Sequence, residues 1–126
     1  MKQLTKAEEQ IMQILWDLKE AVVKDVVNGF EENRPAYTTV ATVLKVLENK
    51  GFVQVRKVGN TNLFYPMVSK TDYTRFQFSS LLKNYFNGSF PRMATFFANE
   101  NNLSIQDLEE MMKNADLEFY NTENEE

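Results

Sequence analysis

Pro35-Ala-Tyr-Thr-Thr-Val-Ala-Thr-Val-Leu-Lys-Val-Leu-Glu-Asn-Lys-Gly-Phe-Val53 is the most informative part of this chain. An apolar stripe recurs along it at helical spacing and predicts an amphipathic helix over residues 38–49. The stripe consists of Val40, Val43, Leu44 and Leu47. Gly51 stands where a helix commonly ends in left-handed backbone, so the helix is expected to stop there. The hydroxyl and charged residues fall mainly off the stripe and therefore face outward.

A β-hairpin is predicted immediately after this helix. Residues 52–58 alternate between apolar and polar side chains, the alternation breaks at Gly59-Asn60, and it resumes over residues 63–68. Two further helices are predicted before the helix over residues 38–49. One begins at Thr5, which has capping-box spacing to Glu8, and the other covers residues 22–30. Three helices followed by a hairpin indicate a winged helix-turn-helix domain, which we expect over residues 1–70.

Residues 71–120 are predicted to form three further helices, over 71–87, over 90–99 and from Ser104 onward. This segment contains ten aromatic residues. About 50 residues of helix cannot enclose ten aromatic rings in a core of their own. A two-fold dimer is one way to bury the rings, and folding back onto the first domain is the other. We therefore expect a mainly α fold, in which a winged helix with a small hairpin wing precedes a helical dimerisation domain. The acidic tail, residues 121–126, is expected to be disordered. The residues expected in the dimer interface are Tyr73, Phe76, Leu81, Leu82, Tyr85, Phe86, Phe96, Phe97, Leu108, Met111 and Met112.

Composition excludes several classes of protein. The chain has 126 residues, 43% of them hydrophobic, which suits one domain or one domain with a small appendage. Cysteine and histidine are both absent, so thiol chemistry, the commonest general base and the commonest metal ligands are missing. We therefore expect neither a metal nor a cofactor. The first residues lack the apolar run of a signal peptide, and no stretch approaches the ~18 apolar residues of a membrane span. A cytoplasmic protein without membrane insertion is expected.

Charge is distributed unevenly along the chain. The formal net charge is −4, yet residues 1–70 carry ten Lys or Arg against eight Asp or Glu, while residues 71–126 carry four against ten. The first domain is therefore slightly positive and the second strongly acidic. A small positive balance is compatible with phosphate binding and equally with an ordinary mixed-charge surface.

The predicted third helix carries residue types that suit the major groove of DNA. Threonine hydroxyls can hydrogen-bond to base edges, their methyl groups can contact thymine, and a lysine one turn further can reach phosphate or guanine. A basic pair beside the hairpin tip can contact the DNA backbone or minor groove. The alternatives are that the threonines only cap the helix and that the basic pair is a solvated edge. The residues predicted to contact DNA are Arg34, Tyr37, Thr38, Thr39, Thr42, Lys45, Arg56, Lys57 and Asn60.

An enzyme fits this sequence poorly. Carboxylate pairs such as Glu31-Glu32 and Glu109-Glu110 fall on predicted turns or solvent faces, and no nucleophile has a base partner. The four glycines form no phosphate-binding pattern, and no catalytic residues are predicted. A small-molecule effector site among the C-terminal helices stays open, although the Met111-Met112 pair and the aromatic stripe favour packing.

The chain resembles the bacterial penicillinase-repressor family, which includes repressors of beta-lactamase and methicillin-resistance genes and copper-responsive relatives. The resemblance rests on residues 35–53 quoted above and on three further segments. These are Leu4-Thr-Lys-Ala-Glu-Glu-Gln-Ile-Met-Gln-Ile-Leu-Trp16, Leu63-Phe-Tyr-Pro66 and Phe97-Ala-Asn-Glu-Asn-Asn-Leu-Ser104. It implies a homodimer that occupies a palindromic DNA operator and represses transcription.

The resemblance also implies how repression is relieved. In the resistance-gene members, a membrane sensor-protease triggers cleavage in the dimerisation region, and the matching junction here is Phe96-Phe97. The best-known members have asparagine on the first side of that bond. Some members carry arginine in the recognition helix where this chain has Ala41, which shifts base preference toward Thr42 and Lys45. Copper sensing in the relatives depends on C-terminal cysteines, which this chain lacks.

The sequence thus predicts a DNA-binding transcriptional repressor. The alternative is a winged-helix module that binds other proteins and has lost DNA binding, because a fold does not fix a function. The acidic net charge and Ala41 are the observations that favour this alternative.

Overall fold

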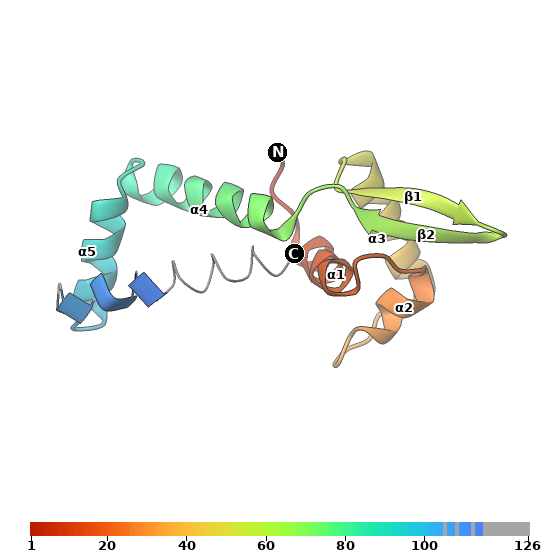
Figure 1. Cartoon of the computed structure of the whole chain (residues 1–126), viewed down its shortest axis with the longest axis horizontal. Helices are drawn as coiled ribbons and strands as arrows, with labels where there is room; N and C mark the ends of the chain where they lie inside the picture. Colours follow the sequence, from red (N-terminus) through yellow and green to blue (C-terminus); the bar gives the residue numbers. More distant parts are fainter. Residues whose placement is uncertain (105, 108, 112, 115–126) are drawn as a thin grey trace. The chain divides into compact units, whose positions relative to one another are not determined.

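The computed structural model describes residues 1–104, 106, 107, 109–111, 113 and 114. The chain forms two compact units, a first unit of Met1–Gln77 and a second unit of Phe78–Glu126. In chain order, helices α1 to α3 precede the hairpin of β1 and β2, and α4 and α5 follow it (Figure 1). The elements are α1 (Lys6–Leu18), α2 (Val23–Asn28), α3 (Tyr37–Asn49), β1 (Val53–Val58), β2 (Thr61–Pro66), α4 (Lys70–Phe86) and α5 (Phe90–Glu100).

Local sequence signals explain where the helices of the first unit begin and end. The Thr5 hydroxyl accepts from the Glu8 backbone N–H (3.2 Å), and the Glu8 carboxylate accepts from the Thr5 N–H (2.8 Å), which completes the predicted capping box. Helix α3 begins at Tyr37, one residue before the predicted start, and ends as predicted at Asn49. Gly51 follows with φ +81°, a left-handed conformation that most other residues avoid.

The core of the first unit lies between the three short helices and the hairpin. The predicted stripe of α3 is buried at Val40, Leu44 and Leu47, and Val43 packs at the edge of the core. The other large, fully buried side chains belong to α1, α2 and the start of the hairpin, which makes one continuous apolar centre. They are Met12, Leu15, Val26, Phe52 and Val53.

The hairpin is tied to the helices at its base and extends freely at its tip. Strands β1 and β2 pair antiparallel from Val53–Pro66 to Val58–Thr61, so Gly59 and Asn60 alone form the turn. Gly59 has φ +63°, as a two-residue hairpin turn requires. Phe64 exchanges two backbone hydrogen bonds with Ala21 (2.8 and 2.9 Å), which anchors β2 to the segment between α1 and α2. Figure 1 shows the tip of the hairpin projecting beyond α3.

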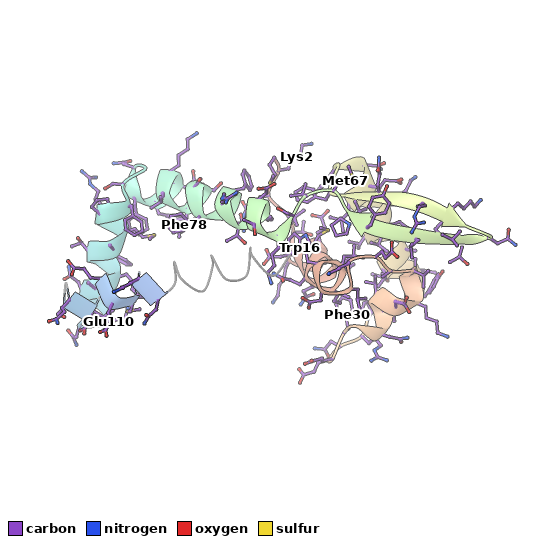
Figure 2. All side chains as sticks on the ribbon, in the orientation of Figure 1. Lys2, Trp16, Phe30, Met67, Phe78 and Glu110 are labelled. Atoms are coloured by element: carbon purple, nitrogen blue, oxygen red, sulfur yellow. The ribbon has the colours of Figure 1, made fainter. Side chains whose placement is uncertain are left out.

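The first turns of α4 pack on the first unit, and this corrects one expectation. Tyr73, expected in a dimer interface, is only 3% exposed, and its hydroxyl accepts the Leu4 backbone N–H at 2.9 Å. Its ring contacts those of Trp16, Phe52 and Phe76, at centroid distances of 6.0, 5.8 and 6.0 Å. The indole N–H of Trp16, labelled in Figure 2, donates to the Val68 carbonyl at 2.9 Å.

The division between the units consequently falls inside α4, after Gln77, rather than before it at residue 70. The rings of Tyr73 and Phe76 do fold back onto the first domain, as the alternative to dimerisation required. Tyr73 is therefore a core residue of the first unit, and Phe76 packs against that core. Tyr73 is thus unavailable to a dimer interface, whereas Phe76 keeps part of its surface exposed.

Several large apolar side chains are exposed in the described part of the second unit. Ser89 caps α5 by accepting from the Arg92 N–H at 3.2 Å, as its position before Pro91 predicts. Phe78 contacts Phe90, and Phe86 contacts Phe96, at centroid distances of 6.1 and 5.7 Å. The expected interface residues Leu108 and Met112 and the tail 121–126 lie outside the described residues. The large apolar side chains exposed in this unit are Phe78, Leu81, Tyr85, Phe96, Phe97 and Met111.

Among the residues that the structure describes, we find no helix whose length and apolar character would let it cross a membrane.

Gly29→Ala is expected to destabilise the first unit. Gly29 ends α2, and a Cβ built there lies only 2.6 Å from Cγ2 of Ile14 on α1. Because that methyl group is fixed by a β-branched side chain, α1 and α2 must move apart, at a cost of about 1–3 kcal/mol of unfolding free energy. Chemical denaturation at one protein concentration measures the loss. In an Ile14→Ala background the same substitution should cost clearly less, and equal costs in both backgrounds would contradict the proposed clash.

Candidate nucleic-acid interface

Helix α3 presents two different exposed sides, separated by the helical period. Thr38 and Thr42 lie on the outermost side, opposite the buried stripe, and both are exposed. Tyr37, Ala41 and Lys45 follow one another at intervals of four residues on a neighbouring side. The outermost side of the helix therefore presents hydroxyl groups. The neighbouring side, called the sideways row below, presents the phenol of Tyr37, the methyl group of Ala41 and the ammonium group of Lys45.

The threonines of α3 are not its caps. The N-cap is Ala36, and within the part of the chain that the structure describes no side chain caps this helix. The first N–H groups of α3 consequently point at solvent, where a helix has its positive end. The Thr42 hydroxyl donates to the Thr38 carbonyl at 2.9 Å, so its oxygen remains available as an acceptor and its methyl group for apolar contact. The capping alternative for the threonines is therefore excluded.

The sideways row of α3 forms one wall of a groove of about 650 Å³. The start of α2 and the hairpin form the other walls, so three separate elements of the first unit meet there. The polar lining offers two lysines, one carboxylate, a phenol and side-chain amides, which is a donor-rich set suited to an anion such as phosphate. The lining residues are Val22, Val23, Lys24, Tyr37, Ala41, Lys45, Glu48, Val55, Asn60, Thr61, Asn62 and Phe64.

The predicted cations differ in how they are held. Lys45 Nζ lies 2.9 Å from Glu48 Oε1, and Arg56 lies 3.1 Å from Glu20 across the hairpin. Arg34 donates to the carbonyls of Asn28 and Phe30 (3.2–3.3 Å), so it closes the end of α2 rather than lining the groove. All three side chains are exposed, and exposed pairs of this kind contribute little to stability. Turning any of these side chains toward a phosphate therefore costs the fold little stability.

The structure brings together part of the predicted contact set. Tyr37, Lys45 and Asn60 line the groove, and Thr38 and Thr42 lie beside it on the outer side of α3. Thr39 is exposed on the far side of these threonines, and Lys57 is exposed on β1 next to Arg56.

Sequence reasoning missed four polar groove residues, Lys24, Glu48, Thr61 and Asn62. Lys24 gave no signal, because α2 was identified by its apolar residues alone. Thr61 and Asn62 follow the predicted Gly59-Asn60 break, and no local pattern distinguished them as groove residues. Glu48 stands three residues after Lys45, and this ion-pair spacing on a predicted helix was the signal that could have identified it.

Metal chemistry finds no support in the groove. Within the described ranges, no group of three or more Asp, Glu, His or Cys residues is arranged to hold a metal ion.

The chain is similar in sequence and in fold to known repressors. The family model described as penicillinase repressor matches residues 4–116. The chain is 24% identical over 110 residues to the penicillinase repressor of Bacillus licheniformis, covering 86% of each chain. It is 23% identical to the methicillin resistance regulatory protein MecI of Mammaliicoccus sciuri, covering 86% of this chain and 89% of the relative. The solution structure of the DNA binding domain of the repressor BlaI superposes with a TM-score of 0.50 at 24% identity. It covers 56% of this chain and 88% of that domain, and the likeness shows the shared winged-helix fold.

Proposed function

The chain belongs to the penicillinase repressor family, and we propose that it represses transcription by binding a palindromic DNA operator as a homodimer in the cytoplasm. Members of this family are transcriptional repressors and not enzymes. The observation that carries the proposal is the groove itself. Lysines from α2 and α3 and amides from the hairpin meet there, directly beside the outward threonines.

The proposed binding mode assigns a separate task to each side of α3. Thr38 and Thr42 meet base edges in the major groove, where a threonine can accept from an amino group and contact a thymine methyl. The DNA strand that borders the major groove lies in the protein groove between α3 and the hairpin, where its phosphates contact Lys24 and Lys45. Lys57 and Asn60 on the hairpin contact the backbone further along. Tyr37, at the open start of α3, is placed to bind another phosphate.

The proposed dimer uses the second unit. Among its described residues, this unit exposes six large apolar side chains, with Tyr85 76% exposed and Phe96 55%, and extended exposed apolar surface is typical of protein interaction sites. A second copy of the chain buries them with two-fold symmetry, and two-fold symmetry in the protein matches a palindromic operator. Of the predicted interface, Leu81, Leu82, Tyr85, Phe86, Phe96, Phe97 and Met111 remain in this proposal.

Relief by proteolysis, triggered by a membrane sensor-protease, forms a finer part of the proposal. The side chains of Phe96 and Phe97 are exposed, but their peptide bond lies within α5, between the Ser89 cap and Glu100. A protease needs an extended strand of substrate, so α5 must open locally before the bond can be cut. Cleavage there would divide α5, detach its last turn together with the C-terminal residues, and weaken the dimer.

Selection from a library of randomised duplexes tests the proposed function. The full chain is mixed with the library, bound duplexes are recovered through repeated rounds, and their sequences are compared. We expect an inverted repeat with half-sites about one helical turn apart, or a multiple of that spacing. Light scattering should give the mass of two chains. If no sequence is enriched although the chain is folded, the protein-interaction alternative replaces the repressor.

Thr42→Ala is expected to relax specificity at one base pair of each selected half-site. The loss for the preferred base should be about 1–3 kcal/mol, because one base contact is removed while the phosphate contacts remain. Competition between the selected duplex and single-base variants measures it. Lys57→Met provides the contrast, since losing a phosphate contact weakens all sequences alike and lowers the salt slope by about one. Equal weakening of selected and random DNA by Thr42→Ala would remove Thr42 from the base-reading set.

A further inference from the structure

One ion pair in the groove holds a carboxylate next to a lysine. Lys45 is the groove lysine that α3 contributes, and its ammonium group is paired with the Glu48 carboxylate at 2.9 Å. Both side chains line the same groove, where Lys24 is the other positively charged residue. A phosphate entering the groove therefore meets a negative charge beside the lysine that should attract it.

The Lys45–Glu48 ion pair contributes little to the stability of the fold. The side chain of Lys45 is 70% exposed and that of Glu48 is 29% exposed, and a solvated pair three residues apart on a helix adds little stability. A carboxylate in an anion-binding groove is costly for binding and nearly neutral for folding. Its effect must therefore be sought in binding.

We propose that Glu48 is a specificity-determining residue, which pairs with Lys45 in the free protein and withholds this lysine from DNA of arbitrary sequence. This inference rests on the proposed function. Random DNA offers Lys45 only a loosely placed phosphate, which does not displace the carboxylate. An operator held in register by the threonines of α3 places a phosphate close enough to Lys45 to replace Glu48. The carboxylate thus lowers affinity for random DNA more than for the operator.

Salt titration of binding to a random-sequence duplex of about 30 base pairs tests the inference. Glu48→Gln keeps the size of the side chain and removes its charge, so Lys45 becomes available to any phosphate. We expect affinity for random DNA to rise about tenfold at 0.1 M salt, and the slope of log K against log salt to steepen by about one. Affinity for the selected duplex should rise much less, so the ratio of specific to random binding falls.

Two matched variants separate this mechanism from a general charge effect. Glu100→Gln makes the same change in net charge on an exposed carboxylate of the second unit, and it should change random binding less than twofold. In a Lys45→Met background, Glu48→Gln should have no larger effect than Glu100→Gln, because no lysine is left to release. Thermal unfolding of the Glu48→Gln variant should match that of the unmodified chain.

Four results would overturn the inference while leaving the proposed function intact. Glu48→Gln could act no more strongly than Glu100→Gln, or act equally with and without Lys45. It could raise selected and random affinity by the same factor, or it could weaken random binding. Failure of the unmodified chain to bind any duplex would instead refute the proposed function, and this inference with it.

Discussion

Tyr73→Ala should lower the free energy of unfolding by about 3–5 kcal/mol, the range found when a large buried ring is truncated. Tyr73 is 3% exposed, contacts three other rings and accepts a hydrogen bond from the Leu4 backbone. Its removal leaves a cavity between α1, the start of β1 and the first turn of α4. Calorimetry or chemical denaturation of the full chain measures the loss, and the melting temperature should fall by about 10 °C or more.

Tyr73→Phe separates the hydrogen bond from the ring. It keeps the aromatic contacts and leaves the Leu4 N–H buried without its partner, so we expect a smaller loss of about 1–3 kcal/mol. Both variants should leave the dissociation constant of the proposed dimer nearly unchanged, because Tyr73 is enclosed by its own chain. A loss that disappears at high protein concentration would contradict this placement, since it would mean that Tyr73 stabilises the dimer rather than the first unit.

The misplacement of Tyr73 shows where sequence reasoning about the fold stops. Helix periods, caps and the Gly51 stop are encoded within a few residues, and the structure confirms them at Thr5, Ser89 and Gly51. The hydrogen bond from Leu4 to Tyr73 joins residues 69 positions apart, and no local pattern reports such a contact. Along α4, rings that enter the first core and rings that remain exposed look alike in sequence. Which ring belongs to which unit is decided only by tertiary packing.

The candidate site, too, could be predicted from the sequence only in part. The outward side of α3 was predictable, because the apolar stripe fixes which residues point away from the core. The groove was not predictable, because its walls come from three elements whose approach depends on the Ala21–Phe64 bridge and on the hairpin register. Lys24 could consequently be identified only from the assembled walls, whereas Glu48 had a local signal in its spacing from Lys45.

Glu8→Gln should destabilise the chain by about 3 kcal/mol at neutral pH, since it removes one partner of a buried ion pair. Glu8 is 4% exposed, and its carboxylate accepts from Lys50 Nζ and from the Thr5 N–H, both at 2.8 Å. Lys50 caps the end of α3, so the pair joins the start of α1 to the helix that carries the threonines. Glutamine can still close the capping box, but it leaves the Lys50 ammonium without its counter-charge. Glu9→Gln is the matched control, and we expect a change below about 0.5 kcal/mol.

The loss should also depend on pH in a specific direction. Burial acts to raise the pKa of Glu8, but hydrogen bonds from Lys50 and Thr5 outweigh it and hold the pKa below its ordinary value of 4.5. The folded chain therefore binds this proton more weakly than the unfolded chain does. The stability that Glu8 contributes is fully present above about pH 6 and is lost as the pH falls through the folded pKa. The difference between the unmodified chain and Glu8→Gln should accordingly be constant from pH 6 to 8 and shrink below pH 4.5.

A double variant decides whether the pair itself is responsible. With Lys50→Met added to Glu8→Gln, no charge remains unpaired in the partly buried site, so most of the loss should be recovered. Chemical denaturation of the unmodified chain, Glu8→Gln, Lys50→Met and the double variant, at pH 7 and at pH 4, completes the double-mutant cycle. If the double variant loses the sum of the two single losses, or if the Glu8→Gln deficit persists unchanged at low pH, the two residues act independently. The end of α3 is then held by its apolar stripe alone.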